Sequence, residues 1–399
     1  MKIVLINNLF KPYARGGAER VVETIADGLT EQGHEVIVVS TRLFQVTIRQ
    51  LADKYEKYFF YPWNIISYFN LHKLPKILRL PWQLINIFNI QSYFKIKKIL
   101  RREKPELVMT HNLMGVGFLT PLAIKKLNIK HIHVLHDIQL IHPSGLIIKG
   151  GENITESFFA RVYQNINKKL FGSPNAVISP SRWLLGQYAQ KGFFKNSKKI
   201  IINNPIPSIP HGIATSSSRV PSRGLGTRYG TPPRNDNKDK FIFLYVGQVE
   251  KHKGAEIMVD SFKQLKNENA ELWIVGSGSE ISSIKYQISN TQNIKLLGKK
   301  TPNEVHEIMK KAHCLVVPSL CYENSPTVIF EARQNNLPVI ASSIGGIPEM
   351  LDKQFLFKAG DEGSLKNKMQ WVIDNYGKMQ VEKPVNFSVN EYIEKILEL

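Results

Sequence analysis

The chain of 399 residues contains only two cysteines, Cys314 and Cys321, and both lie in or close to an apparent strand. Two cysteines cannot supply a disulfide framework, and their spacing is not that of a zinc site. A disulfide-stapled fold and a structural zinc module are therefore excluded. The simplest interpretation is a protein of the reducing cytosol.

Long apolar runs are also missing. The apolar start MKIVLIN is too short for the core of a signal peptide, and no run approaches the roughly 20 apolar residues that a spanning helix requires. We therefore expect a cytoplasmic protein that is soluble or bound peripherally, at the inner face of a membrane.

Acidic residues are scarce relative to basic ones, with 33 Asp and Glu against 53 Lys and Arg and a net charge of +20. This balance indicates an anionic partner such as nucleic acid, a phosphorylated ligand or an anionic membrane. A basic nucleic-acid-binding protein stays an alternative because of this charge. The sequence has no helix-turn-helix, zinc-finger or RNA-binding signature to support it. The first strand is not followed by Gly-x-Gly-x-x-Gly, which argues against an NAD-linked dehydrogenase.

What the sequence does contain is an alternation of short β-branched runs with helical stretches. The runs are KIVLIN, EVIVVS, ELVMTHN, HIHVLHD and AVISPS in the first half and FIFLYVG, ELWIVGSG, NIKLLG, CLVVPS and PVIAS in the second. Such strands are typical of parallel sheets covered on both faces, and 399 residues exceed one core. The predicted fold class is α/β, with two doubly wound Rossmann-like domains facing a cleft, over residues 1–200 and 201–385.

Two stretches depart from this alternation. Residues 211–240 are rich in Ser, Gly, Pro and Arg, which predicts a loop or linker. Residues 55–104 mix aromatic residues and leucines with lysines and arginines, as a surface in a lipid interface requires. Alternatively, the aromatic residues are core and the basic residues are its solvated side. Pro62, Pro75 and Pro81 interrupt any single long helix there.

The segment CYENSPTVIFEARQNNLPVIASSIGGIPEM, residues 321–350, follows a predicted strand at the sheet edge where α/β proteins bind ligands. Ser325 is predicted to cap a helix whose first residue is Pro326. The free amides of Thr327 and Val328 would then form a phosphate site.

Two carboxylates, Glu323 and Glu331, flank this predicted phosphate site. Acceptor-only side chains suit vicinal hydroxyls, and a nucleotide-sugar has hydroxyls on both sides of its diphosphate. Two glutamates at this spacing are also common on helix surfaces, so the assignment depends on the neighbouring strand, loop and Gly-Gly turn.

In the order of its motifs the chain resembles the retaining GT-B glycosyltransferases of the large family numbered four, over nearly its whole length. The motifs are GGAERVVETIADGLTEQGHEVIVVS, LHD at 135–137, AVISPSRWL at 176–184, VGQVEKHKG at 246–254, IVGSGSE at 274–280 and the Glu-x7-Glu element.

The resemblance implies roles for individual residues. Glu323 matches the glutamate that contacts donor-sugar hydroxyls, Glu331 the one that holds the ribose, and Lys253 the lysine that neutralises the diphosphate. The remaining predicted donor-binding residues of this loop are Asn324, Ser325, Pro326, Thr327 and Val328.

In the first half, the resemblance implies that Gly16 and Gly17 form a glycine loop whose backbone approaches the diphosphate and the acceptor. His136 matches the cleft histidine near the reacting centre. His111 also follows an apolar strand, and we favour His136 over it.

One position departs from the family. Five residues before Lys253, where an arginine is usual, stands Gln248. Glutamine donates a hydrogen bond but supplies no charge, so stabilisation of the leaving group would rest more heavily on Lys253 and the helix start. Lys251 or an arginine of residues 211–240 could substitute.

The family implies a hexosyltransferase-type enzyme that moves a sugar from a UDP- or GDP-linked donor to a saccharide or lipid-linked saccharide with retention, as in bacterial surface-polysaccharide synthesis. Catalysis would rest on His136, Lys253 and Glu323. No Asp-x-Asp pair is present, so no metal and no other cofactor is required by this interpretation. Residues 386–399 would form a helix that packs back onto the first domain. A nucleotide-sugar epimerase or a phosphorylase of the same fold stays an alternative.

Overall fold

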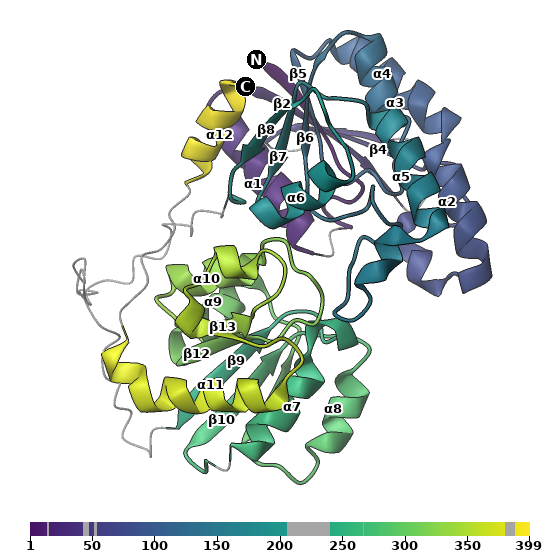
Figure 1. The fold of residues 1–399 in the computed structure, drawn as a ribbon. Helices are drawn as coiled ribbons and strands as arrows, with labels where there is room; N and C mark the ends of the chain where they lie inside the picture. Colours follow the sequence, from purple (N-terminus) through teal and green to yellow (C-terminus); the bar gives the residue numbers. More distant parts are fainter. Residues whose placement is uncertain (14–15, 43–47, 52–53, 206–239, 266, 380–387) are drawn as a thin grey trace. The chain divides into compact units, whose positions relative to one another are not determined.

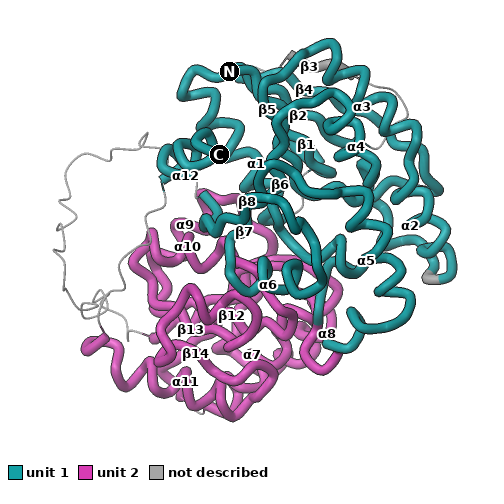
Figure 2. Tube along the Cα trace, turned by 45° about the horizontal axis from the view of Figure 1, so that its top comes forward, with its two compact units in different colours: residues 1–147, 152–208, 387–399 teal, residues 148–151, 209–386 magenta. Residues whose placement is uncertain are grey.

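The structure, a computed structural model, describes residues 1–13, 16–42, 48–51, 54–205, 240–265, 267–379 and 388–399. The chain divides into two compact units, each with its own sheet and core (Figure 1, Figure 2). Unit 1 comprises residues 1–147, 152–208 and 387–399, and unit 2 comprises residues 148–151 and 209–386. Nearly all of the predicted linker at 211–240 lies outside the described residues.

Unit 1 is built on an eight-stranded sheet in the order β3-β4-β2-β1-β5-β6-β7-β8, parallel throughout except for the edge pair β3–β4. All residues of β5 and β7 are buried, which explains why these sequences are continuous apolar runs. The strands are β1 Lys2–Ile6, β2 Glu35–Thr41, β3 Ile48–Leu51, β4 Glu56–Phe60, β5 Leu107–Thr110, β6 Lys130–Val134, β7 Ala176–Ser179 and β8 Lys198–Ile201.

Helices cover both faces of this sheet (Figure 1). On one face α1 and α12 share a core with Ile3 and Leu5 of β1, and on the other α3, α4 and α5 pack side by side. The helices of unit 1 are α1 Gly17–Glu31, α2 Arg79–Ile87, α3 Ile90–Glu103, α4 Thr120–Lys126, α5 Phe158–Phe171, α6 Arg182–Gln190 and α12 Val389–Leu397.

Unit 2 has a six-stranded parallel sheet in the order β11-β10-β9-β12-β13-β14. Its strands are β9 Phe241–Val246, β10 Ala270–Val275, β11 Ile294–Gly298, β12 Cys314–Val317, β13 Val339–Ser342 and β14 Leu356–Phe357. Its helices are α7 Ala255–Gln264, α8 Ile281–Gln287, α9 Pro302–Lys311, α10 Thr327–Gln334 and α11 Glu362–Asn375.

The strand order of each unit reverses direction once. In unit 1 this happens between β1 and β5, and in unit 2 between β9 and β12. Open α/β sheets bind ligands outside the carboxyl ends of the strands at such a switch point. The loops after three of these strands carry predicted site residues, with Gly16 after β1, Lys253 after β9 and Glu323 after β12. His111 follows the fourth, β5, whereas the favoured histidine, His136, follows the neighbouring strand β6.

The chain crosses between the units at two short segments, each of which belongs to a different unit from the residues that precede it. Residues 148–151 join unit 2, where the amide of Lys149 donates to the carbonyl of Leu320 at 2.9 Å. The C-terminal helix α12 joins unit 1, where the side chains of Tyr392, Ile393 and Ile396 are fully buried. Within the described ranges, no helix has the length and apolar character needed to span a membrane.

Candidate active site

The centre of the candidate site in unit 2 is an ion pair between Lys253, in the short 3-10 turn after β9, and Glu323, in the loop after β12. The Lys253 Nζ lies 2.6 Å from the Glu323 Oε1. The same carboxylate oxygen also accepts hydrogen bonds from Ser319 Oγ at 2.8 Å and Cys321 Sγ at 3.5 Å. Sequence analysis predicted the lysine and the glutamate but missed Ser319 and Cys321, for which only their position in the loop gave a signal.

Two glycines allow this loop to approach its neighbours. Gly345 has a φ of +63°, and a Cβ there would lie 2.2 Å from the carbonyl oxygen of Glu323. The amide of the next residue, Gly346, donates to that carbonyl at 2.7 Å. Gly254, with a φ of +74°, would place a Cβ 1.9 Å from the carbonyl oxygen of Pro318. The Gly-Gly turn of the sequence motif therefore holds the backbone of Glu323, and only glycine fits at these positions.

The pair is ionised at neutral pH. Burial by itself would raise the pKa of the Glu323 carboxyl, but the Lys253 charge and the hydrogen bonds hold that pKa below 4.5. Burial opposes the charge of Lys253 as well, yet the carboxylate of Glu323 raises the lysine pKa above 10.5. Burial and the Glu323 charge raise the pKa of the Cys321 thiol to about 12, so this thiol stays protonated and donates.

The helix that follows begins one residue later than predicted. α10 starts at Thr327, and its N-cap is Pro326, with φ −62° and ψ 116°, which has no side chain able to cap. The prediction that Ser325 caps the helix was wrong, because the extended ψ of Pro326 places Ser325 one residue too early. Instead, the Ser325 Oγ is buried without a hydrogen-bond partner among the described residues. The first amides of α10, from Thr327 and Val328, have no acceptor within the helix.

The other predicted donor-binding residues lie on the same elements. Glu331 is the fifth residue of α10, as its position in the motif implied, and it is half-buried. Gln248 is exposed after β9, and its carbonyl accepts a hydrogen bond from the Tyr245 hydroxyl at 2.6 Å. Lys251 is exposed in the turn that carries Lys253, while the arginines of residues 211–239 lie outside the described residues.

In unit 1, the two histidines between which sequence analysis chose form one pair. The Nδ1 of His111 and the Nε2 of His136 share a hydrogen bond of 2.9 Å, and the ring centroids are 5.2 Å apart. Burial lowers the pKa of His136 to about 4. Burial also lowers the pKa of His111 well below its ordinary value, and electrostatic repulsion from a protonated His136 acts in the same direction. Both rings are therefore neutral at neutral pH. The Nε2 of His111 is buried without a partner among the described residues.

A carboxyl that sequence analysis did not single out stands beside this pair. Burial raises the pKa of Asp137 to about 7, and the nearby charge of Glu19 acts in the same direction. The backbone amide of Gln139 donates to Asp137 at 2.8 Å. Asp137 is the last residue of the LHD motif, so the motif itself held the signal. A carboxyl that titrates near neutrality can exchange a proton at working pH.

The predicted glycine loop lies at the start of α1. Gly16 is the N-cap and Gly17 the first residue of the helix, and both are exposed. The Gly16 amide donates to the Glu19 carboxylate at 2.8 Å, so this amide is already engaged. The open part of the glycine loop is accordingly the backbone from Gly17 onward.

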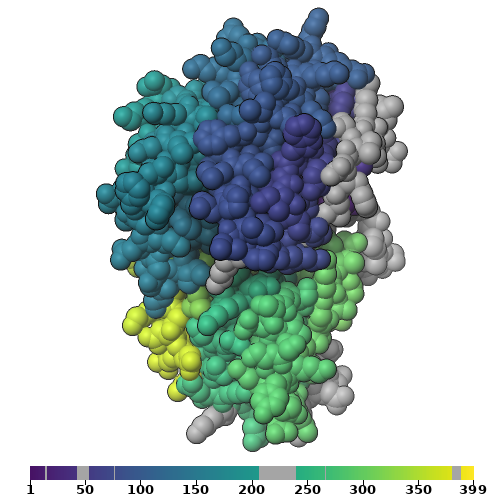
Figure 3. All heavy atoms as spheres, turned by 90° about the vertical axis from the view of Figure 1, so that its right-hand side faces the viewer, coloured from purple at the N-terminus to yellow at the C-terminus, as the bar shows by residue number. Residues whose placement is uncertain are grey.

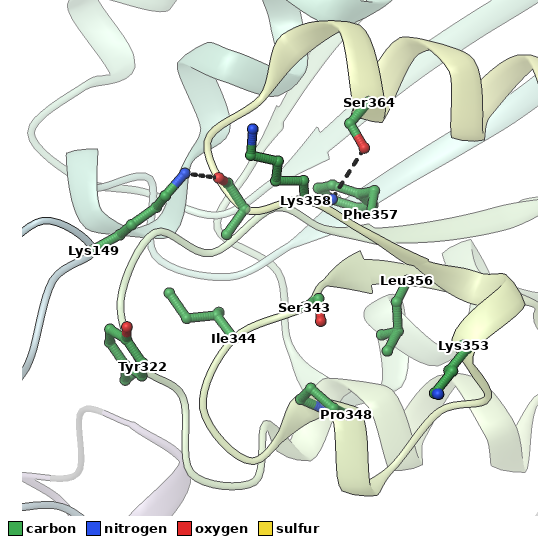
Figure 4. A pocket seen from close by; sticks show the side chains of 11 residues that line it. Lys149, Tyr322, Ser343, Ile344, Pro348, Lys353, Leu356, Phe357, Lys358 and Ser364 are labelled. Carbon is green, nitrogen blue, oxygen red and sulfur yellow. Dashed lines mark hydrogen bonds between the residues drawn. The ribbon is translucent and has the colours of Figure 1, made fainter.

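A cavity of about 640 Å³ lies in unit 2 beside the Gly-Gly turn, with Ile344 and Pro348 in its lining. Figure 4 shows Lys149, Lys353 and Lys358 around it, with Tyr322 and Ile344 on the side of the turn. The ammonium of Lys149 donates to the carbonyl of Ala359. None of the predicted donor-binding residues lines this cavity, so it is adjacent to the candidate site and distinct from it.

Two family models match the chain in succession. Glycosyltransferase Family 4 matches residues 15–208, and Glycosyl transferases group 1 matches residues 232–392. The chain therefore belongs to the group 1 glycosyltransferases with the GT-B fold, which confirms the family suggested by the motifs.

Curated relatives agree with this assignment. The chain is 26% identical to an uncharacterized protein in the cps region of Klebsiella pneumoniae, over 88% of this chain and 87% of that one. It is 25% identical to an uncharacterized glycosyltransferase of Methanocaldococcus jannaschii, over 88% and 83%. It is 23% identical to the O-antigen biosynthesis glycosyltransferase WbnH of Escherichia coli, over 71% and 72%.

Solved structures share the fold at lower identity. Sucrose-phosphate synthase from Thermosynechococcus elongatus has a TM-score of 0.71 at 16% identity, covering 100% of this chain and 98% of that one. Anabaena HepE in complex with UDP-glucose has a TM-score of 0.64 at 17% identity, covering 100% and 98%.

Proposed function

We propose that this glycosyltransferase moves a hexosyl group from a nucleotide-diphosphate sugar to a saccharide or lipid-linked saccharide, with retention of anomeric configuration. The observation that carries the donor assignment is the juxtaposition of the Lys253–Glu323 pair with the start of α10, beside the unpartnered hydroxyl of Ser325. A cation and free amides suit a diphosphate, and carboxylates suit sugar hydroxyls. The UDP-glucose complex of HepE and the O-antigen relative support the donor class and a role in surface-polysaccharide synthesis.

In this mechanism, the positive charge of Lys253 and the first amides of α10 stabilise the negative charge that develops on the departing diphosphate. Glu323 holds donor-sugar hydroxyls and Glu331 holds the ribose, so both position the donor and neither acts as a general base. The acceptor hydroxyl attacks from the side that the leaving group vacates, and a diphosphate oxygen takes its proton. No metal ion is needed, and we expect activity to persist in a chelator.

Unit 1 would receive the acceptor through the backbone from Gly17 onward and through neutral His136. A neutral imidazole can donate or accept a hydrogen bond without placing a second cation near the reacting centre. The enzyme would work in the cytoplasm, at the inner face of an anionic membrane when its acceptor is lipid-linked.

The test is the change in thermal unfolding midpoint on adding UDP, GDP, ADP or CMP to the full chain. A ligand at about a hundred times its Kd stabilises the native state by roughly 2.7 kcal/mol. We expect one nucleoside diphosphate to stabilise the wild type, and Lys253→Ala and Glu331→Ala to reduce that ligand-induced shift.

Lys285→Ala is the matched control, because Lys285 is an exposed lysine of α8 in the same unit. It should leave the shift unchanged. If no nucleotide stabilises the wild type, or if both site variants respond as the wild type does, the proposed donor site is wrong. Turnover of donor in the absence of any acceptor would instead indicate an epimerase.

A further inference from the structure

The helix α2 of unit 1 has its polarity inverted. Its outward face is apolar, with Leu80 68% exposed and Leu84 47% exposed. Its inward face is partly polar, since Gln83 and Asn86 are buried beside Trp82. A surface helix of a globular domain normally presents the opposite arrangement. The alternative in which the aromatic residues of 55–104 are core and the basic residues its solvated side therefore fits β4, whose last three residues are buried, and Trp82 of α2. It does not account for the exposed leucines of α2.

Hydrogen bonds fix this orientation of α2. The Nε2 of Gln83 donates to the Tyr163 hydroxyl of α5 at 3.0 Å, and the Oδ1 of Asn86 accepts from the Gly115 amide at 2.7 Å. The indole N–H of Trp82 donates to a backbone carbonyl, that of Ile66, at 2.7 Å. Turning the apolar face inward would break all three bonds, so its exposure is built into the fold.

The apolar surface continues along both neighbours of α2. Exposed apolar side chains recur every three or four residues along α2 and its flanking residues, and again at the start of α3. We call this set the α2–α3 ridge: Ile77, Leu80, Leu84, Phe88, Ile90 and Phe94. Trp63, 71% exposed, is held at the junction of the two helices, because its carbonyl accepts from Asn89 Nδ2 at 2.8 Å. On α5, which contacts α2 through Tyr163, Phe158 and Phe159 are exposed as well.

Along the segment that carries the α2–α3 ridge, the charged side chains have one sign. Residues 57–102 contain nine Lys and Arg and no Asp or Glu. On α3 the side of Ile90 and Phe94 continues into Lys98, Arg101 and Arg102, all exposed. The surface is visible in Figure 3, where the atoms of residues 60–100 lie in blue on the outside of unit 1. An apolar centre flanked by cations is complementary to an anionic lipid leaflet, with its apolar boundary and charged headgroups.

We propose that the α2–α3 ridge docks unit 1 onto an anionic lipid bilayer, with Trp63 and the ridge in the headgroup boundary and the basic end of α3 on the headgroups. A second copy of the chain fits less well, because an isologous contact would bring two sets of these cations together. The surface is remote in sequence from the donor residues, so the proposal stands whether or not the proposed function is correct. Where the acceptor is lipid-linked, it explains how the enzyme reaches it.

The experiment is flotation of the full chain with vesicles of phosphatidylcholine, with or without phosphatidylglycerol, in the absence of nucleotide. We expect the wild type to float with the anionic vesicles and less well as salt rises. The double variant Leu80→Gln with Leu84→Gln should bind them at least about tenfold more weakly, because two apolar side chains no longer enter the bilayer. Arg101→Glu should weaken binding and reduce its salt dependence.

The matched controls are Tyr286→Gln and Lys285→Glu, both on α8 of unit 2, where Tyr286 is 84% exposed. Both should bind vesicles as the wild type does. A blue shift of Trp63 fluorescence on binding, absent in Trp63→Phe, would place this side chain in the lipid. The proposal is overturned if the wild type does not float, if the ridge variant binds as well as the wild type, or if the ridge variant dissociates a dimer while vesicle binding is absent.

Discussion

Ser325 carries the least satisfied side chain of the candidate donor site, because its hydroxyl is buried and lacks a partner among the described residues. A hydroxyl left in that state costs free energy in the unliganded protein, and it can donate a hydrogen bond when an anion binds beside it. The Ser-Pro pair therefore makes sense as a phosphate contact followed by a helix start, and not as a helix cap.

We predict that Ser325→Ala leaves the free energy of unfolding unchanged or slightly higher, while the affinity for the stabilising nucleotide falls about tenfold. Urea denaturation and calorimetric titration measure the two quantities. Thr301→Ala is the control, since the Thr301 hydroxyl does cap α9 by accepting the Glu304 amide at 3.3 Å. That variant should cost about 1 kcal/mol and leave nucleotide affinity unchanged. The reverse pattern in the two variants would show that Ser325 is structural.

Glu323 makes stability depend on pH. Its pKa in the folded protein lies below the ordinary value of 4.5, so the ionised carboxylate stabilises the fold above that value. This stabilisation is lost as the pH falls through the depressed pKa. We expect the unfolding free energy of the wild type to fall more steeply below pH 4.5 than that of Glu323→Gln, measured by urea denaturation across a pH series. Glu268→Gln, an exposed residue of unit 2, should keep the wild-type slope.

At the scale of elements, the Gly-Gly turn after β13 determines where Glu323 stands. We predict that Gly345→Ala lowers the unfolding free energy by about 1–3 kcal/mol and abolishes the nucleotide-induced thermal shift. The added Cβ meets the Glu323 carbonyl and moves the loop that carries the carboxylate.

Gly298→Ala is the control that distinguishes the cost of the backbone conformation from that of the steric clash. Gly298 also has a positive φ, +69°, but open space around it. It should show only the cost of the backbone conformation, about 1–2 kcal/mol. Equal unfolding free energies for the two variants would mean that the contact with Glu323 does not matter.

The ten strands predicted from apolar runs are all present, because a strand buried on both faces has a distinctive composition. Four strands were not predicted: β3, β4, β8 and β14. Three of them, β3, β8 and β14, lie at sheet edges, where this signal is weaker, and β4 lies within residues 55–104, which sequence analysis singled out for their aromatic and basic composition. Sequence analysis placed Glu323 in the loop after a predicted strand and Lys253 after another. The direct contact between the two side chains depends on Gly254 and Gly345, whose φ angles no motif specifies.

The inverted helix α2 shows what the sequence leaves open. Its apolar and basic residues were evident, yet which side faces the core depends on Gln83 and Asn86 finding partners in Tyr163 and Gly115. Those partners are 80 and 29 residues away in the chain. Similarly, the passage of residues 148–151 into unit 2 rests on contacts with the loop after β12, which local patterns do not encode.

At the scale of the whole molecule, the two units have separate cores, and the chain ends in the one in which it began. The helix α12 closes the core of unit 1 over α1. Gly28 makes the contact close, since a Cβ there would lie 2.2 Å from Val389. The C-terminal helix is thus a structural part of unit 1, although it follows unit 2 in the sequence.

This arrangement predicts that a destabilising substitution in α12 lowers the stability of unit 1 alone. Ile393→Ala removes a fully buried side chain and should cost about 2–5 kcal/mol. Hydrogen exchange read by mass spectrometry should show faster exchange in β1 and α1, while β9 and β12 exchange as in the wild type. Glu394→Ala, exposed on the same helix, should change neither set. Faster exchange in both units would mean that their cores unfold together, so that α12 stabilises the whole chain through unit 1.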